Sequence, residues 1–98
     1  MDLELNFSFK GKACSCRAFI DISEQPYFIF TIQRDTDIIR KYGDDISIKT
    51  DLSAILPHDN DWIAGMADVR QAIFEAFVTT SEYYIIRSQL SKSNATKQ

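Results

Sequence analysis

Apolar and polar side chains alternate at the start of the chain, from residue 3 to residue 9. A period of two is typical of a β-strand that buries one face. Gly11 and Lys12 follow, and they fit the two central positions of a tight hairpin turn, with Gly in the first position. A second strand then runs over residues 13 to 22. On the buried face, this hairpin pairs Phe9 with Cys14, Phe7 with Cys16, Leu5 with Ala18 and Leu3 with Ile20.

The alternation continues into a third strand, residues 27 to 34, which follows a turn at residues 24 to 26. A three-residue loop fixes the register of this second hairpin, because the loop length decides which residues stand opposite one another. In the resulting register, Phe28, Phe30 and Ile32 lie on the buried face against the second strand. The sequence therefore predicts that the third strand contributes two aromatic rings to the core.

The outer face of this predicted sheet is less polar than a solvated face should be. It carries Phe19, Tyr27 and Ile29 beside Arg17. We therefore interpret Phe19, Tyr27 and Ile29 as candidates for a protein interface. An aromatic face with an arginine also resembles, in outline, the stacking platform of proteins that bind single-stranded nucleic acid.

The stretch from residue 35 to residue 45 predicts a short helical turn. Asp37 can cap its start, and Gly43 can take the left-handed position at its end. A tight hairpin through residues 42 to 45 is the alternative. Residues 45 to 50 then resume the alternation of a strand, the fourth of the predicted sheet.

The pattern changes period after residues 59 to 61, whose Asp and Asn side chains are suited to cap a helix. Apolar residues now recur every three or four positions, which predicts one long helix from about residue 61 to residue 89. The β-branched run at residues 78 to 81 is its weak point. There the helix could break in two, or residues 82 to 89 could form a strand instead.

These elements predict an α+β fold: a four-stranded antiparallel sheet with one long C-terminal helix packed on one face. A single domain is expected over residues 1 to 90. Residues 91 to 98 are polar and small, so we expect them to be a disordered tail.

The predicted helix is apolar over an arc wider than one sheet face can cover. Its second apolar stripe includes Phe74, Val78 and Ile85. Two explanations remain open. Apolar side chains in the linker at residues 52 to 56 could fold over this flank, or the flank could bind a partner or a second copy of the chain. Phe74, Val78 and Ile85 are therefore further candidates for a protein interface.

The charge balance bears on the partners of this chain. The net charge is −3, but residues 1 to 86 hold eight basic and 14 acidic side chains, a net charge of −6. An acidic body repels phosphate backbones, which argues against nucleic acid as a partner. The sequence shows neither a long apolar run nor the pattern of a signal peptide, so we expect no membrane association and a cytoplasmic location.

The side chains best suited to chemistry are few. Cys14 and Cys16 alternate within a predicted strand, and buried thiols behave as small apolar side chains. A structural zinc site needs four Cys or His ligands, and the chain offers these two and His58. We therefore expect no metal and no cofactor. His58 beside Asp59 and Asp61 is the one candidate general base, but no nucleophile motif accompanies it.

Two functional hypotheses follow. The first is a small soluble interaction or regulatory module, without enzymatic activity, that self-associates as a homodimer or binds another protein through its surplus apolar surface. The alternative is a small-ligand binder or a minor enzyme that uses His58 near the start of the long helix. No motif in the sequence identifies a family.

Overall fold

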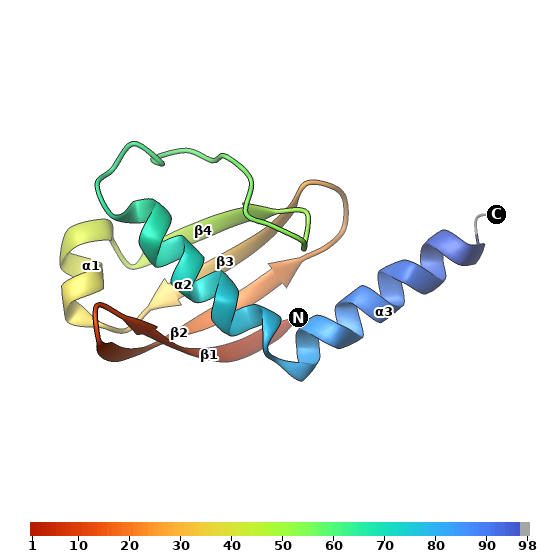
Figure 1. Ribbon diagram of the computed structural model, residues 1–98, viewed down its shortest axis with the longest axis horizontal. Helices are drawn as coiled ribbons and strands as arrows, with labels where there is room; N and C mark the ends of the chain where they lie inside the picture. The colour runs from red at the N-terminus through yellow and green to blue at the C-terminus, as the bar shows by residue number, and fades with distance from the viewer. Residues whose placement is uncertain (97–98) are drawn as a thin grey trace.

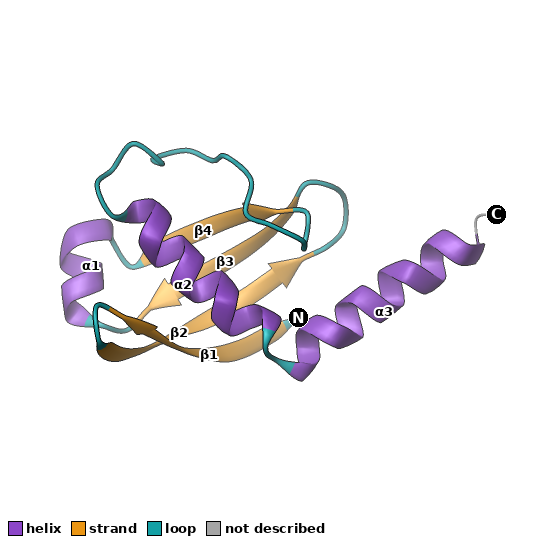
Figure 2. Ribbon diagram, viewed as in Figure 1, coloured by secondary structure: helices purple, strands orange, loops and turns teal. Residues whose placement is uncertain are grey.

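A computed structural model describes the backbone of residues 1–96 and the side chains of residues 1–91. Within that part of the chain, four strands form one antiparallel sheet in the order β1-β2-β3-β4 (Figure 1). The strands are β1 (Asp2–Phe9), β2 (Lys12–Asp21), β3 (Tyr27–Gln33) and β4 (Asp45–Thr50). The helices are α1 (Thr36–Tyr42), α2 (Met66–Val78) and α3 (Ser81–Thr96) (Figure 2). The α+β class and the four-stranded antiparallel sheet are confirmed.

The turn between β1 and β2 differs from the prediction, yet the buried face is the one predicted. Lys10 and Gly11 both have positive φ, 52° and 74°, as the central residues of a type I′ turn require. Phe7 therefore stands opposite Cys14, where the predicted turn at Gly11 and Lys12 placed Phe9. The error is two residues, and because side chains alternate with a period of two, the same side chains still face the core.

The predicted register between β2 and β3 is wrong by one residue. Ile20 stands opposite Ile29, and Phe19 opposite Phe30, where we expected Phe30 to face Ile20. The physical reason is the connection, which spans residues 22 to 26 and is longer than the three-residue loop of the prediction. A shift of one residue exchanges the two faces of a strand.

The two faces of β3 are consequently the reverse of those expected. Tyr27 and Ile29 are buried in the core, while Phe28, Phe30 and Ile32 lie on the outer face. Two polar residues of the buried face are linked by hydrogen bonds: the Gln33 amide donates to the Thr31 hydroxyl at 2.7 Å, and that hydroxyl donates to the carbonyl of Ile46 at 2.7 Å. The amide oxygen of Gln33 is buried without a hydrogen-bond partner among the described residues.

The core lies between the sheet and α2, which crosses the inner face (Figure 1). Phe77 and Ile73 of α2 are fully buried, as are Ile29 and Ile48 of the sheet. Phe77 also packs edge-on against Tyr83 of α3, with ring centroids 5.3 Å apart. Burying each large apolar side chain of this kind contributes roughly 1.5–3 kcal/mol to the free energy of unfolding. The side chains of α2 therefore supply much of the apolar burial that stabilises the fold.

The prediction of one long C-terminal helix is wrong, because the chain forms two helices in its place. The break falls at the β-branched run that was the weak point of the pattern. The hydroxyl of Thr79 donates to the carbonyl of Ala76, and that of Thr80 to the carbonyl of Phe77, at 2.8 and 2.6 Å. These bonds satisfy the last carbonyls of α2, and the Thr80 hydroxyl then accepts from the backbone N–H of Tyr83 at the start of α3.

The start of α2 and the end of α3 also differ from the prediction. Gly65, with φ of 86°, precedes α2, so residues 59 to 64 form turns instead of a first helical turn. The helix α3 projects away from the sheet and runs to Thr96, beyond residue 89, where we expected the helix to end; the disorder expected for residues 91 to 98 stays a prediction (Figure 1). Extending an established helix costs little per residue, which accounts for this continuation. Residues 97 and 98 lie outside the described part.

The short helix and the fourth strand agree with the prediction. The cap itself differs, because Asp35, two residues before the expected Asp37, caps α1: its carboxylate accepts from the backbone N–H groups of Asp37 and Ile38, both at 3.0 Å. Gly43, with φ of 88°, ends the helix as expected, so the alternative hairpin is wrong. Among the described helices, none is both long enough and apolar enough to cross a lipid bilayer.

Candidate functional site

The outer face of the sheet, opposite α2, carries a cluster of exposed apolar side chains. Phe19 of β2 is 47% exposed, and Phe30 and Ile32 of β3 are 41% and 53% exposed. Phe28 is half-buried and stacks on Phe30, with ring centroids 5.7 Å apart. We call these four residues the apolar patch. They lie on the two central strands, so the patch is at the middle of the face and not at its margin.

Charged side chains surround the apolar patch on the same face. The strand register fixes their places, because residues opposite one another in a ladder point to the same side of the sheet. An apolar centre with a charged rim is the usual anatomy of a protein–protein interface. The charged neighbours are Asp21 and Lys49 on either side of Phe28, and Arg17 and Asp45 on either side of Ile32.

The loop between β4 and α2 closes the patch on one side. His58 comes from this loop and packs edge-on against Phe28, with ring centroids 5.6 Å apart. Its Nε2 lies 3.0 Å from the hydroxyl oxygen of Ser47 on β4. The backbone N–H of Leu56 donates to the carbonyl of Lys49 at 2.8 Å, so the loop also covers the outer edge of β4. Covering an edge in this way blocks unwanted strand pairing there.

Arg70 of α2 anchors the loop between β4 and α2. Its guanidinium is buried and donates to the carbonyl of Ser47 at 3.0 Å and to that of Asp59 at 2.8 Å, and it forms an ion pair with Asp61. The backbone N–H of His58 donates to the Asp61 carboxylate, and together with Arg70 it holds the pKa of Asp61 below the usual value. Asp59 and Asp61 therefore anchor this loop, and the expectation that they cap a helix is wrong.

The contact between Ser47 and His58 has the composition of a nucleophile and a general base. A catalytic pair also needs a group that orients the imidazole and donors that stabilise the developing oxyanion. Among the described hydrogen bonds, none reaches Nδ1 of His58. Ser47 lies on an open sheet face, and its contact serves to fasten the loop.

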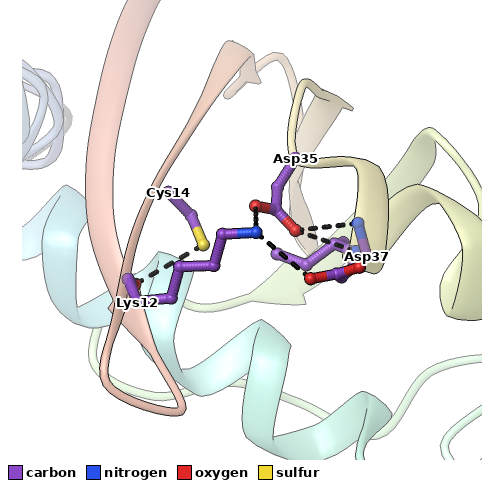
Figure 3. A network of polar contacts seen from close by, with 5 residues as sticks. Lys12, Cys14, Asp35 and Asp37 are labelled. Atoms are coloured by element: carbon purple, nitrogen blue, oxygen red, sulfur yellow. Dashed lines mark hydrogen bonds and ion pairs between the residues drawn. The ribbon is translucent and has the colours of Figure 1, made fainter.

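A cavity of about 200 Å³ lies elsewhere, between the β1–β2 turn and α1. Lys12 and Cys14 of β2 face Asp35 and Asp37 there (Figure 3). The Lys12 ammonium lies 2.8 Å from the Asp35 carboxylate and 3.1 Å from that of Asp37, and it lowers the pKa of Asp35. Lys12 and the two aspartates are therefore paired with one another, and the other charged side chains that line the cavity are Lys10 and Lys41.

The two cysteines behave as the sequence predicts. Both are free thiols on the inner face of β2 and are buried. Burial raises the pKa of the Cys14 thiol, and it raises the pKa of Cys16 to about 11. Cys14 also donates a weak hydrogen bond to the carbonyl of Lys12 at 3.6 Å. A raised pKa leaves little of either thiol as the reactive thiolate at neutral pH.

No protein-family model matches this chain. Nor does any curated protein or solved structure resemble it at a significant level. The function therefore has to be argued from the surface of the molecule itself.

The sheet residues predicted for the interface separate into two groups. Phe19 lies on the outer face and is exposed, as expected. Tyr27 and Ile29 were placed on that face by the mistaken register, and both are buried in the core instead. The residues that take their place on the surface are Phe30 and Ile32.

The helix residues predicted for the interface do not form one surface. Phe74 is buried in the core, Val78 is half-buried, and Ile85 is 48% exposed on α3. The break between α2 and α3 separates Val78 from Ile85, so the continuous stripe expected on one long helix does not exist. Leu52 of the linker is also buried, and its carbonyl accepts from the Tyr83 hydroxyl at 2.7 Å. Of the two explanations left open for the helix flank, this packing favours intramolecular cover.

Sequence reasoning missed Phe28, Phe30 and Ile32 as surface residues. Residues 27 to 32 are apolar at nearly every position, so alternation cannot tell which face is buried. The one signal available was the length of the connection from Asp21. There, the Asp21 carboxylate accepts from the N–H and hydroxyl of Ser23 and forms a turn before Pro26.

Proposed function

We propose that this protein is a small interaction module that binds a protein partner through the apolar patch on the outer sheet face. The observation that carries this proposal is the choice of face in β3. The strand buries Thr31 and Gln33 while it exposes Phe30 and Ile32. A chain that had only to cover its own core would favour the opposite arrangement.

The apolar surface left exposed at the patch supports this role. Phe19, Phe30 and Ile32 are each about half exposed. Together they leave on the order of 250 Å² of apolar surface in water, taking about 200 Å² for a fully exposed side chain of this size. At about 25 cal/mol per Å², covering that surface yields about 6 kcal/mol before the entropic cost of association.

The patch is also held in one conformation. Its residues stand on the two central strands of the sheet. The contact of His58 with Phe28 and the anchoring of its loop by Arg70 fix the remaining side. A surface that is already ordered loses little conformational entropy when a partner binds, which supports a role in recognition.

The experiment places a photo-crosslinking amino acid on the surface in living cells. One variant carries benzoylphenylalanine in place of Phe30, and the matched control carries it in place of Tyr84, an aromatic residue of α3 that is 67% exposed. We expect adducts of defined mass from position 30 and not from position 84. We also expect the substitution Phe19→Asp to abolish them, because it places a charge beside the crosslinker. If the two positions gave the same adducts, or if Phe19→Asp left them unchanged, the proposal would be wrong.

A further inference from the structure

The outer face arranges its side chains in three parallel rows. Residues two apart on a strand lie on the same face, so neighbouring rows are about 7 Å apart along the strands. In the order β2, β3, β4, the rows are Asp21, Phe28 and Lys49 on one side, Phe19, Phe30 and Ser47 in the middle, and Arg17, Ile32 and Asp45 on the other. The edge strand β1 adds Asp2 to the middle row and Glu4, which forms an ion pair with Arg34, to the row of Arg17. The two outer rows therefore carry opposite charges at corresponding ends.

We propose that the partner of this face is a second copy of the same chain, related by a two-fold axis that runs along the middle row, perpendicular to the strands. This inference rests on the proposed function. Such an axis keeps each strand opposite itself and exchanges the two outer rows. Asp21 then meets Arg17 of the second copy, Lys49 meets Asp45 of the second copy, and Phe28 meets Ile32 of the second copy.

On β2, β3 and β4, every member of the outer rows finds a complementary group under this operation, while at the margin of the face Asp2 of β1 lies opposite Asp2 of the second copy. Each ion pair forms twice, once from either copy, and the middle row places Phe19 and Phe30 at the centre of the dimer. The four charges on β2 and β4, those of Arg17, Asp21, Asp45 and Lys49, sum to zero within each copy, although residues 1 to 86 carry a net charge of −6. Arg17 lies 3.7 Å from Asp2 within one chain, but both are exposed, and an exposed pair of this kind is exchanged at little cost.

The other two-fold arrangement of facing sheets is unfavourable. An axis parallel to the strands keeps the rows and exchanges β2 with β3. Arg17 would then cover Ile32 of the second copy, which buries a charge against an apolar side chain. The same axis exchanges β1 with β4 and brings Glu4 over Asp45 of the second copy, a contact between like charges. The charge pattern therefore selects the perpendicular axis.

The size of the face sets the strength of the dimer. Four strands about 4.8 Å apart and about 8 residues long offer roughly 500 Å² per copy, or about 1,000 Å² in total. That area is near the lower limit of specific interfaces. We therefore expect a dimer that dissociates in the micromolar range, with the two sheets crossing at about 30° because of their twist.

The test is an exchange of charges within β4. Lys49 and Asp45 lie four residues apart on one strand, about 13 Å at 3.3 Å per residue, too far for a contact within one chain. Lys49→Asp or Asp45→Lys alone brings like charges together across the axis, and we expect each to weaken dimerisation about tenfold or more. The double variant has the composition and net charge of the original chain and restores both pairs, so we expect it to dimerise like the wild type.

Sedimentation equilibrium of the full chain from low micromolar to near-millimolar concentration measures these constants. The control variant Arg87→Asp alters an exposed charge of α3 by the same amount as Lys49→Asp and leaves the outer face intact. A wild-type monomer at every concentration would overturn the second copy as partner, and a double variant as weak as the single ones would overturn the axis. Either result leaves the crosslinks from position 30 to another protein, and hence the proposed function, standing.

Discussion

Replacing Arg70 by alanine tests whether the buried guanidinium holds the loop between β4 and α2. In the native chain this side chain donates to two backbone carbonyls, those of Ser47 and Asp59, and pairs with the carboxylate of Asp61. Alanine removes all three contacts at once. The carbonyl of Ser47, on the outer edge of β4, then loses its donor from the protein.

The size of the expected stability loss depends on how exposed the groups that Arg70 contacts are. Breaking a fully buried ion pair costs about 3–5 kcal/mol, because an unpaired charge stays in the interior. Here the Asp61 side chain is 41% exposed and regains water once Arg70 is gone, so its share is small. Hydrogen bonds from a charged donor contribute about 1.5–3 kcal/mol each. With part of that loss recovered by water, we expect Arg70→Ala to lower the free energy of unfolding by about 3 kcal/mol.

Urea unfolding followed by circular dichroism measures this change. A loss of 3 kcal/mol corresponds to roughly 12–24 °C in Tm for a chain of this size, so thermal melting gives a second readout. Arg87→Ala is the matched control, since Arg87 is exposed on α3 and its one described hydrogen bond, to the Tyr83 hydroxyl, is 3.3 Å long. We expect it to cost less than about 1 kcal/mol. If Arg70→Ala were no more destabilising than Arg87→Ala, the anchoring role would be refuted.

Two further predictions concern the glycine before α2 and the thiols. A Cβ on Gly65, whose φ is 86°, would lie 2.1 Å from the Tyr42 hydroxyl. We therefore expect Gly65→Ala to lower the free energy of unfolding by about 3 kcal/mol, against about 1 kcal/mol for Gly11→Ala, where an added Cβ has no atom within 4 Å. Adding Tyr42→Phe should restore about half of the larger loss in urea titrations, and no restoration would contradict the clash. Because burial raises the pKa of both thiols, iodoacetamide should label native Cys14 slowly and Cys16 more slowly still. The rate for Cys16 should still be rising at pH 9, because its pKa is about 11 and the thiolate fraction increases up to that value. Rapid labelling of Cys16 at pH 7, seen by mass spectrometry, would contradict its burial.

The parts of the fold that depend on local pattern could be predicted from the sequence. Alternation identified β1 and β2 and their buried face, and Gly43 marked the end of α1 correctly. An error of two residues in the first turn did no harm, because it returns every side chain to the same face. Phe19 was placed on the outer face for the same reason, since the pattern of β2 is unambiguous.

The rest depended on contacts between distant residues. Residues 27 to 32 fit either face, and only the length and bonding of the preceding loop decided between them. The break at Thr80 was visible as a weak point, but packing against the sheet decided that the chain would turn there. The approach of His58 to Ser47 required both the correct path of the loop and the position of β4, which no local pattern contains.

The sheet order has a consequence for how the chain acquires its structure during synthesis. Each strand pairs with the strand that precedes it, so the sheet can grow by successive hairpins with little loss of entropy in closing loops. The helix α2, which covers the inner face, is translated only after β4. A ribosome-bound chain therefore exposes the inner apolar face until α2 emerges, and the cooperative folding step must await that helix.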